Sequence, residues 1–420
     1  MRFHRLLTLG CVIAAAGTGL AACGGDDDDG GGGGGGESGG GELHIYSSLP
    51  LEGASRNQAT ALVNGMKLAL EQKGGKAGDF TIKYTSLSDA SAQAGSWTPE
   101  LTSANARRAA QDDKTAVYLG EFNSGASAIS IPILNEAGVP QISPANTAVG
   151  LTTDEAGADA GEPEKYYPTG ERTYVRIVPK DTIQGAALAT VMKEDGCQNV
   201  AVANDKEVYG AGLARNIVSA AESQGLKIAF NEGIDPKAAN YRALASRARG
   251  QDVDCFAFSG ITANNAAQIY KDFAAAIPDL KLYGPDGVAE GAFTNPEEGG
   301  IPESVGRRTT VTVATLSPDE YPPEGQEFFK QYSEKYGDET PDPYAIYGYE
   351  AMMLALDAIE RAGSGDRADI LEALFATKDR KSVLGTYSID ENGDTSLTDY
   401  GVYKIEDGEL TFDKTVKAQT

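Results

Sequence analysis

Strand-like and helix-like segments alternate along most of this chain, and the alternation limits the possible folds more than any other feature. The first run predicts strands at 43–48 (LHIYSS), 80–85 (FTIKYT), 115–120 (TAVYLG) and 139–143 (VPQIS), separated by helices at 56–73, 98–112 and 125–137. Such alternation is typical of a parallel sheet with helices on both faces. The first part of the chain therefore predicts one α/β unit.

A second run of the same kind follows an acidic, glycine-rich loop at 153–172. Its predicted elements are strands at 199–204, 226–231, 254–259 and 280–284, separated by helices at 210–224, 237–250 and 262–276. Two more helices are predicted at 325–336 and 343–362, before a tail rich in glycine and aspartate. One sheet is a poor fit for about 380 residues. We therefore predict the α/β class, with two doubly wound parallel-sheet lobes.

The first 41 residues predict export and a membrane anchor. Residues 1–22 begin with Arg2 and Arg5 and continue as an apolar stretch that is short and glycine-rich for a membrane span. They end on small residues before Cys23, which resembles the site where bacterial lipoproteins are cut and lipidated. An ordinary signal peptide ending near a cysteine is the alternative. Residues 23–41 are mostly glycine and aspartate, so we expect a flexible tether. The protein would then be lipid-anchored outside the cytoplasm, on the periplasmic side of the cell membrane or on the cell surface.

Charge and histidine content argue against several classes of function. The formal net charge of −25 is unsuited to nucleic acid or anionic lipid, since both need basic patches. Of the two histidines, His4 lies in the predicted signal peptide, so only His44 is left for a catalytic triad or a zinc site. We predict no metal, no cofactor and no enzymatic activity. A lipid-anchored hydrolase that relies on carboxylates stays open as an alternative.

Two cysteines remain once the signal peptide and the lipidated residue are set aside. Cys11 belongs to the signal peptide and Cys23 would carry lipid, which leaves Cys197 and Cys255. Two cysteines in an oxidising compartment predict a disulfide. They fall at the starts of the first and third strands of the second run, which are neighbours in a doubly wound lobe, so a bond of ordinary Cα separation is feasible. Two separate buried thiols are the alternative.

The loops that follow the predicted strands differ in chemistry between the two runs. In the first run Ser124 stands at a helix start, where free N–H groups favour an anion, and Asn146 and Thr147 follow the next strand. In the second run the loops offer Tyr209 and Asp286, which suit a cation. Ligands of such sheets bind beyond the carboxyl ends of the strands. These residues therefore predict a receptor for a zwitterion.

Four stretches, in this order along the chain, carry a resemblance to a known family: GEFNSGASAISIPILNEAGVPQISPANT (120–147), DKEVYGAGLA (205–214), YGPDGV (283–288) and LGTYSIDENGD (384–394). Together they resemble the substrate-binding proteins of branched-chain amino acid ABC transporters, the leucine/isoleucine/valine-binding family of type I periplasmic binding proteins. The resemblance covers the chain after residue 42. It implies two lobes joined by three crossovers, which close on a ligand about a hinge. The implied lobes are residues 42–177 plus 317–383 and residues 178–316 plus 384–420.

The resemblance also implies a role for each candidate residue. Ser124 and Thr147 would bind the α-carboxylate of the ligand, and Asn146 would offer its carbonyl to the ammonium group. Tyr209 would close over the ligand. Asp286, where many relatives have glutamate, would be the counter-ion of the ammonium group. The implied function is to capture an amino acid, branched-chain or a similar zwitterion, and to deliver it to an ABC permease. We expect a monomer.

Each of these residues also has a purely structural interpretation. Ser124 could only cap its helix, Thr147 and Asp286 could only stabilise turns, and Tyr209 could pack in the core. A sensory lipoprotein that binds a ligand and signals to a receptor is a further alternative to a transport protein.

The chain departs from the family pattern around the expected side-chain pocket. Many relatives have a Ser-Gly turn in the first loop, where this chain has Leu51-Glu52-Gly53, followed by Arg56. Charges of this kind are usually solvated. If Glu52 and Arg56 face the cleft, the ligand would be an amide, a urea-like compound or an acidic amino acid.

Overall fold

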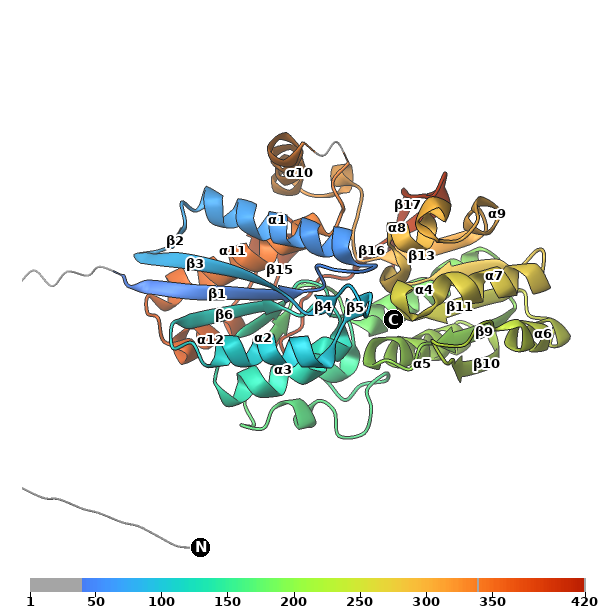
Figure 1. The fold of residues 1–420 in the computed structure, drawn as a ribbon, viewed down its shortest axis with the longest axis horizontal. Coiled ribbons are helices and arrows are strands. Elements are labelled where there is room, and N and C mark those ends of the chain that lie inside the picture. Colours follow the sequence, from blue (N-terminus) through green and yellow to red (C-terminus); the bar gives the residue numbers. More distant parts are fainter. Residues whose placement is uncertain (1–39, 338–339, 419–420) are drawn as a thin grey trace, which may run out of the picture. The chain divides into compact units, whose positions relative to one another are not determined.

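The computed structural model describes residues 40–337 and 340–418. The predicted signal peptide and Cys23 lie outside these residues, as does the tether up to residue 39. The described chain forms two main sheets, each mostly parallel and each covered by helices (Figure 1). The alternating pattern therefore predicted the fold class correctly. No helix in the described ranges is long and apolar enough to cross a membrane.

The first sheet is parallel except at one edge, where β2 runs antiparallel to β3. Its strands are, in order across the sheet, β2 (Lys76–Ala77), β3 (Phe80–Ser88), β1 (Glu42–Leu49), β6 (Thr115–Gly120), β7 (Gln141–Ser143) and β8 (Tyr174–Arg176). Two helices pack together on each face (Figure 1): α1 (Arg56–Gln72) with α11 (Ala345–Ala362), and α2 (Pro99–Ala110) with α3 (Ser124–Glu136). A small hairpin of β4 (Ala90–Ser91) and β5 (Ser96–Trp97) follows β3.

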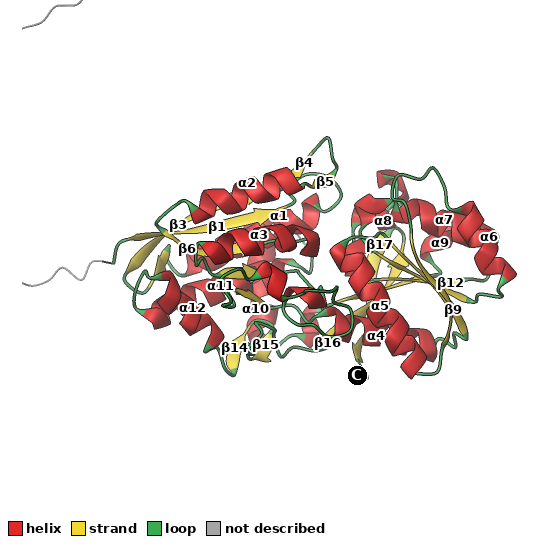
Figure 2. Ribbon diagram, turned by 90° about the horizontal axis from the view of Figure 1, so that it is seen from below, coloured by secondary structure: helices red, strands yellow, loops and turns green. Residues whose placement is uncertain are grey.

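The second sheet begins as a parallel sheet and ends in two antiparallel strands. Its strands are, in order, β10 (Lys227–Gly233), β9 (Asn199–Asn204), β11 (Cys255–Ser259), β12 (Lys281–Gly284), β13 (Thr309–Val313), β16 (Asp399–Glu406) and β17 (Glu409–Lys417). Figure 2 shows its main helices on opposite faces: α4 (Asp181–Glu194) with α5 (Val208–Ser223), and α6 (Arg242–Gly250) with α7 (Ala266–Ala276).

Shorter elements and two further helices complete the described chain. These are η1 (Val149–Leu151), η2 (Glu164–Tyr166), η3 (Thr262–Asn264), η4 (Asp286–Val288), α8 (Gly291–Thr294), η5 (Pro296–Glu298), α9 (Glu303–Gly306), η6 (Pro318–Glu320), α10 (Pro323–Tyr336), α12 (Arg367–Phe375), β14 (Arg380–Ser382) and β15 (Gly385–Tyr387).

We call each main sheet with its helices a lobe, the first lobe around β1 and the second around β9. The chain passes between the two sheets after β8, after β13 and before β16. A buried ion pair joins the first and third of these passages, because Arg176 Nε donates to Asp394 Oδ1 at 2.7 Å. The lobe limits implied by the family resemblance stay a prediction. The hairpin β14–β15 spans the implied limit between residues 383 and 384.

The central strands of both sheets are covered on both faces. Every residue of β6, β9 and β11 is buried, so these strands are largely apolar runs rather than alternating patterns. Helix α2 begins as its sequence predicts, with the Thr98 hydroxyl accepting from the N–H of Leu101 and Pro99 at the first position. The apolar runs of the central strands and the capping sequence of α2 thus predict the same elements that the structure shows.

The sequence interpretation was wrong in two regions. Helix α4 was not predicted, because all of its residues from 184 to 192 are buried and no apolar stripe separates one face from another. The predicted tail after residue 362 instead contains α12, β14, β15, β16 and β17. A signal for the last hairpin was present, since Asp407-Gly408 between β16 and β17 takes positive φ at both residues.

Candidate functional site

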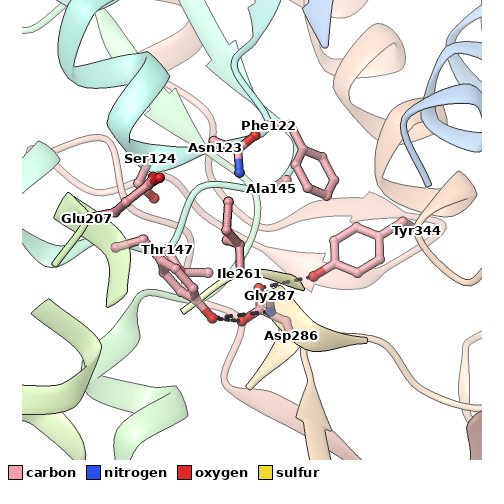
Figure 3. A pocket seen from close by; sticks show the side chains of 11 residues that line it. Phe122, Asn123, Ser124, Ala145, Thr147, Glu207, Ile261, Asp286, Gly287 and Tyr344 are labelled. Carbon is pink, nitrogen blue, oxygen red and sulfur yellow. Dashed lines mark hydrogen bonds between the residues drawn. The ribbon is translucent and has the colours of Figure 1, made fainter. Parts of the chain in front are cut away.

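A cavity of about 420 Å³, which includes space open to solvent, lies where loops of the two lobes meet. Most of these loops follow the carboxyl ends of parallel strands, namely β6 and β7 in the first lobe and β9, β11 and β12 in the second. The lining residues are Phe122, Asn123, Ser124, Ala145, Thr147 and Tyr344 from the first lobe, and Glu207, Tyr209, Ile261, Asp286 and Gly287 from the second (Figure 3).

The first lobe presents hydroxyl groups and the start of a helix to the cavity. Ser124 is the first residue of α3, and its Oγ accepts from the backbone N–H of Ala148 at 3.3 Å. Thr147 is almost fully buried in the loop after β7. The free N–H groups of a helix start carry partial positive charge. This side of the cavity can therefore bind a negatively charged group.

The second lobe presents a buried carboxylate. Asp286 is only 8% exposed, and its Oδ1 accepts from the Tyr209 hydroxyl at 2.6 Å. Tyr344, from the first lobe, donates to Asp286 Oδ2 at 3.2 Å. Burial raises the pKa of Asp286, and these hydrogen bonds offset part of the rise. Burial disfavours the ionised form of Asp286, and a positively charged group on a ligand would stabilise that form.

A second carboxylate lies on the other side of the cavity. Glu207 stands just before α5, and its Oε1 accepts from the side-chain amide of Asn264 at 2.8 Å. Burial and the nearby Asp205 raise its pKa, while Asn264 and the indole of Trp97 offset part of the rise. Trp97 ends β5 in the first lobe, so Glu207 is held by groups from both lobes.

The helix start beneath Glu207 has no room for a side chain. A Cβ atom on Gly125 would come within 2.8 Å of Trp97 Cζ2 and 3.6 Å of Glu207 Oε2. Trp97 and Glu207 thus both pack against the first turn of α3. The absence of a side chain at Gly125 therefore leaves room for the indole of Trp97, a residue of the same lobe, against the start of α3.

Comparison with protein families decides the family. Residues 45–409, which are most of the chain, match a protein family described as "periplasmic binding protein". The chain belongs to the periplasmic binding protein family. As a periplasmic binding protein it is a solute-binding protein that acts outside the cytoplasm, and the family resemblance given by the four sequence stretches is confirmed.

Several known proteins resemble this periplasmic binding protein over most of their length. Leu/Ile/Val-binding protein homolog 1 of Brucella melitensis biotype 1 is 26% identical over 297 residues, which cover 70% of this chain and 73% of the relative. The crystal structure of the leucine-binding protein LivK of Thermotoga maritima has a TM-score of 0.76 at 25% identity, covering 89% of this chain and 99% of that chain. A solute-binding protein from R. palustris in complex with benzoate shares the fold, with a TM-score of 0.70 at 20% identity over 90% of this chain and 97% of that chain.

The structure brings four of the five predicted ligand residues into one cavity: Ser124, Thr147, Tyr209 and Asp286. Asn146 is fully buried behind the lining, where its side-chain amide donates to the Phe122 carbonyl at 2.8 Å. The Asn146 carbonyl lies 3.4 Å from Nη1 of Arg176. The roles of all five residues in binding stay predictions.

The other predicted residues lie away from the cavity. Glu52 and Arg56 are exposed and do not line it, so they have the position of solvated surface groups. Cys197 and Cys255 are joined by a disulfide with a Cα separation of 5.8 Å, at the start of the neighbouring strands β9 and β11. The described residues contain no group of three or more His, Cys, Asp or Glu side chains placed to hold a metal ion.

Sequence reasoning missed several residues of the cavity. Phe122, Asn123 and Glu207 were inside the stretches that carry the family resemblance but were not singled out. Glu207 could have been found, because it lies two residues before Tyr209 in the loop after β9. Tyr344 comes from a segment more than 190 residues away from the nearest first-lobe loop, and only the fold brings it to the cavity.

Proposed function

We propose that this periplasmic binding protein captures an amino acid, branched-chain or a similar zwitterion, between its two lobes and delivers it to an ABC permease. The observation that carries the proposal is Asp286. It is a buried carboxylate that faces the cavity opposite the hydroxyls and helix start at Ser124 and Thr147. A small solute with one positive and one negative end matches this arrangement.

In this proposal each predicted residue acts on one end of the ligand. Ser124 and Thr147 bind the α-carboxylate with their hydroxyls and with N–H groups at the start of α3. Asp286 pairs with the ammonium group, helped by the carbonyl of Asn146, and Tyr209 closes over the ligand. Because the two sets of groups belong to different lobes, a bound ligand stabilises the closed state, which shifts the equilibrium toward it.

The names of the relatives support an amino acid as ligand. The Brucella relative is a homologue of proteins that bind leucine, isoleucine and valine, and the Thermotoga protein is described as a leucine-binding protein. The benzoate complex of the R. palustris protein shows that the same fold also holds a ligand without an amino group. The buried carboxylate of Asp286 supports a ligand with a positive group for this chain.

The remaining parts of the proposal concern the state of the protein. We propose a monomer without enzymatic activity, anchored by lipid on Cys23 through the tether at 23–41. Mass spectrometry of the membrane-bound protein would test the anchor, because lipidation adds acyl mass to a peptide that begins at Cys23. Cys23 unmodified within an intact N-terminus would contradict it.

The test of the binding role is the substitution Asp286→Asn, which keeps the shape of the side chain and removes its charge. A thermal-shift screen of amino acids on the whole purified protein identifies a binder, since a ligand of the native state raises the melting temperature. Calorimetry with that amino acid should then show affinity reduced about tenfold or more in Asp286→Asn.

Asp279→Asn is the matched control, because Asp279 is an exposed aspartate of the same lobe. It should bind as the unchanged protein does. Unaltered affinity in Asp286→Asn would remove Asp286 from the site. A screen in which no amino acid raises the melting temperature would overturn the proposed ligand class.

A further inference from the structure

The side chain of Asn123 makes none of the bonds that an asparagine usually makes at its position. Asn123 is the N-cap residue of α3, where an asparagine oxygen commonly accepts from a backbone N–H of the first turn. Here the side chain makes no capping bond, and neither its Oδ1 nor its Nδ2 is hydrogen-bonded to any residue that the structure describes. The fold of the first lobe therefore does not depend on this amide.

The nitrogen of this amide faces the cavity. Asn123 lines the cavity and is only 8% exposed. Figure 3 shows its amide nitrogen on the cavity side, whereas its oxygen points away from the cavity. When the lobes close on a ligand, an N–H group that loses contact with water without finding an acceptor costs free energy. The position of Nδ2 therefore calls for an acceptor on the ligand.

The α-carboxylate of the proposed ligand does not need this donor. The backbone N–H groups of Ser124, Gly125 and Thr147 donate to no acceptor among the residues that the structure describes. A carboxylate has about four lone-pair sites for hydrogen bonds. These N–H groups, together with the hydroxyls of Ser124 and Thr147, are enough to fill them. The amide of Asn123 is consequently left for a second acceptor on the ligand.

The charges of the cavity wall indicate what kind of acceptor this is. Two of the lining residues, Glu207 and Asp286, are carboxylic acids, and no lysine or arginine among the described residues lines the cavity. A second carboxylate on the ligand would lose its hydration here without gaining a cationic partner, which is unfavourable. The lining residues Phe122 and Ala145 are apolar. A neutral oxygen on a short, partly apolar side chain fits these surroundings.

We infer that Asn123 selects an amino acid whose side chain has a neutral oxygen, either a hydroxyl or an amide carbonyl, and that its Nδ2 donates to this oxygen. The inference rests on the proposed function and narrows the ligand class that it names. An aliphatic side chain of the same shape would bury the N–H of Asn123 without an acceptor. A site built to form a hydrogen bond discriminates against the analogue that lacks the partner group. Asn123 therefore sets the ratio of affinities between polar and aliphatic amino acids of equal shape.

The experiment compares amino acids of nearly equal shape on the whole purified protein: threonine with valine, and asparagine with leucine and aspartate. Calorimetry should show threonine or asparagine binding about tenfold or more tightly than its aliphatic counterpart, because an unsatisfied buried donor costs free energy on this scale. A preference for threonine over valine alone identifies a hydroxyl as the acceptor. A preference for asparagine over leucine alone identifies an amide carbonyl. Aspartate should bind more weakly than asparagine.

Asn123→Leu tests the residue itself, because it keeps the approximate shape of the side chain and removes the donor. The preference for the polar amino acid should fall about tenfold, while the affinity for valine and leucine should not fall. Asn123→Asp, which replaces the donor with an acceptor, should lose the preference as well. The melting temperature of each variant without ligand shows that it is folded. Asn57→Leu is the matched control, because Asn57 is exposed and does not line the cavity, and it should leave every affinity unchanged.

Several results would overturn the inference. Valine and leucine could bind as tightly as threonine and asparagine, or the preference could persist unchanged in Asn123→Leu. An equal loss of affinity for all amino acids in Asn123→Leu would show that the amide binds the α-carboxylate instead. Aspartate binding more tightly than asparagine would contradict a neutral acceptor.

These failures are distinct from a failure of the proposed function. If valine or leucine binds well and Asp286→Asn weakens that binding, the proposed function holds and only the side-chain oxygen is rejected. If no amino acid raises the melting temperature in the wider screen, the proposed ligand class falls, and the role of Asn123 falls with it.

Discussion

The two lobes are built on similar parallel sheets but present different chemistry to the cavity. Loops at the strand ends of the first lobe bring hydroxyls, an amide and a helix start, whereas the same positions in the second lobe bring Glu207 and Asp286. The topology thus fixes where the functional groups stand, and the loop sequences fix what they are. A cleft between such lobes can have an electrically asymmetric interior although its framework is nearly repeated.

The lobes also differ in what stabilises them below the cavity. The second lobe has the disulfide between Cys197 and Cys255. The first lobe instead buries two carboxyl groups, Asp89 and Glu121, both fully inaccessible to solvent. Tyr118 donates to Glu121 Oε1 at 2.7 Å, and burial raises the pKa of Asp89 to about 7 and that of Glu121 well above its ordinary value. The second lobe also buries carboxyl groups with a raised pKa, among them Asp205 and Glu290, so both lobes are sensitive to pH, whereas the disulfide makes the second lobe sensitive to reductant.

The largest expected effect comes from breaking the disulfide. The bond closes a loop with a sequence separation of 58 residues, so the double variant Cys197→Ala/Cys255→Ala should lose about 4 kcal/mol of unfolding free energy in the chain-entropy model. Urea titration measures the loss. Hydrogen exchange should show reduced protection in β9 and β11 and unchanged protection in β1 and β6. Equal losses in both lobes would mean that the disulfide does not act on one lobe alone.

The next effect concerns Asp89, which lies in the first lobe, whereas the disulfide lies in the second. Since its pKa is raised in the folded state, its contribution to stability is present below about pH 4 and is lost as the pH rises to about 7. Asp89→Asn resembles the protonated form. It should reduce the fall in unfolding free energy between pH 4 and pH 8 by about 1–3 kcal/mol, and at pH 8 it should be more stable than the unchanged protein. Thermal unfolding from pH 4 to pH 8 measures it.

A matched control for the pH experiment is Asp79→Asn, because Asp79 is exposed. Its stability curve should follow that of the unchanged protein. If Asp89→Asn retains the full decline between pH 4 and pH 7, the pH dependence of the first lobe has another source.

A smaller effect separates the two tyrosines that hold Asp286. Tyr209 donates at 2.6 Å from the same lobe, and Tyr344 donates at 3.2 Å across the cleft. Tyr209→Phe should therefore weaken amino acid binding by about 1.5 kcal/mol, and Tyr344→Phe by about half as much. Calorimetry on both variants, with Tyr349→Phe as the control, measures which substitution weakens ligand binding more. The reverse order would show that the bond across the cleft dominates.

The smallest effect is expected at the first lobe's own anion site. Ser124→Ala removes one hydroxyl but leaves the N–H groups of α3, so the affinity for a ligand with a carboxylate should fall by about 1 kcal/mol. The affinity for a ligand that lacks the carboxylate, such as the corresponding amine, should not change. An equal loss for both kinds of ligand would show that Ser124 supports the loop rather than a carboxylate.

Much of this architecture could be predicted from the sequence, and the omissions have physical causes. The strands β1, β6, β9 and β11 were found because short apolar runs bounded by polar loops are typical of buried parallel strands. Helix α4 was missed because burial on all sides removes the periodic pattern on which helix prediction depends. Prediction from periodicity therefore works for elements with one exposed face or with a clear strand pattern.

The candidate site shows the same limit. Ser124, Thr147, Tyr209 and Asp286 could be predicted, because each stands directly after a strand or at a helix start. Tyr344 could not, since no local pattern indicates which distant segment returns to the cavity. The burial of Asp286 could not be predicted either, because the loss of contact with water is a property of the folded chain.

Trp97 gives the protein a natural optical reporter. It is the only tryptophan in the chain, and it packs against the first turn of α3 beside Glu207. A charged solute entering there, or a separation of the lobes, would change the polarity around the indole. Selective excitation of this single fluorophore can therefore follow binding in real time without a dye, a tag or any alteration of the molecule.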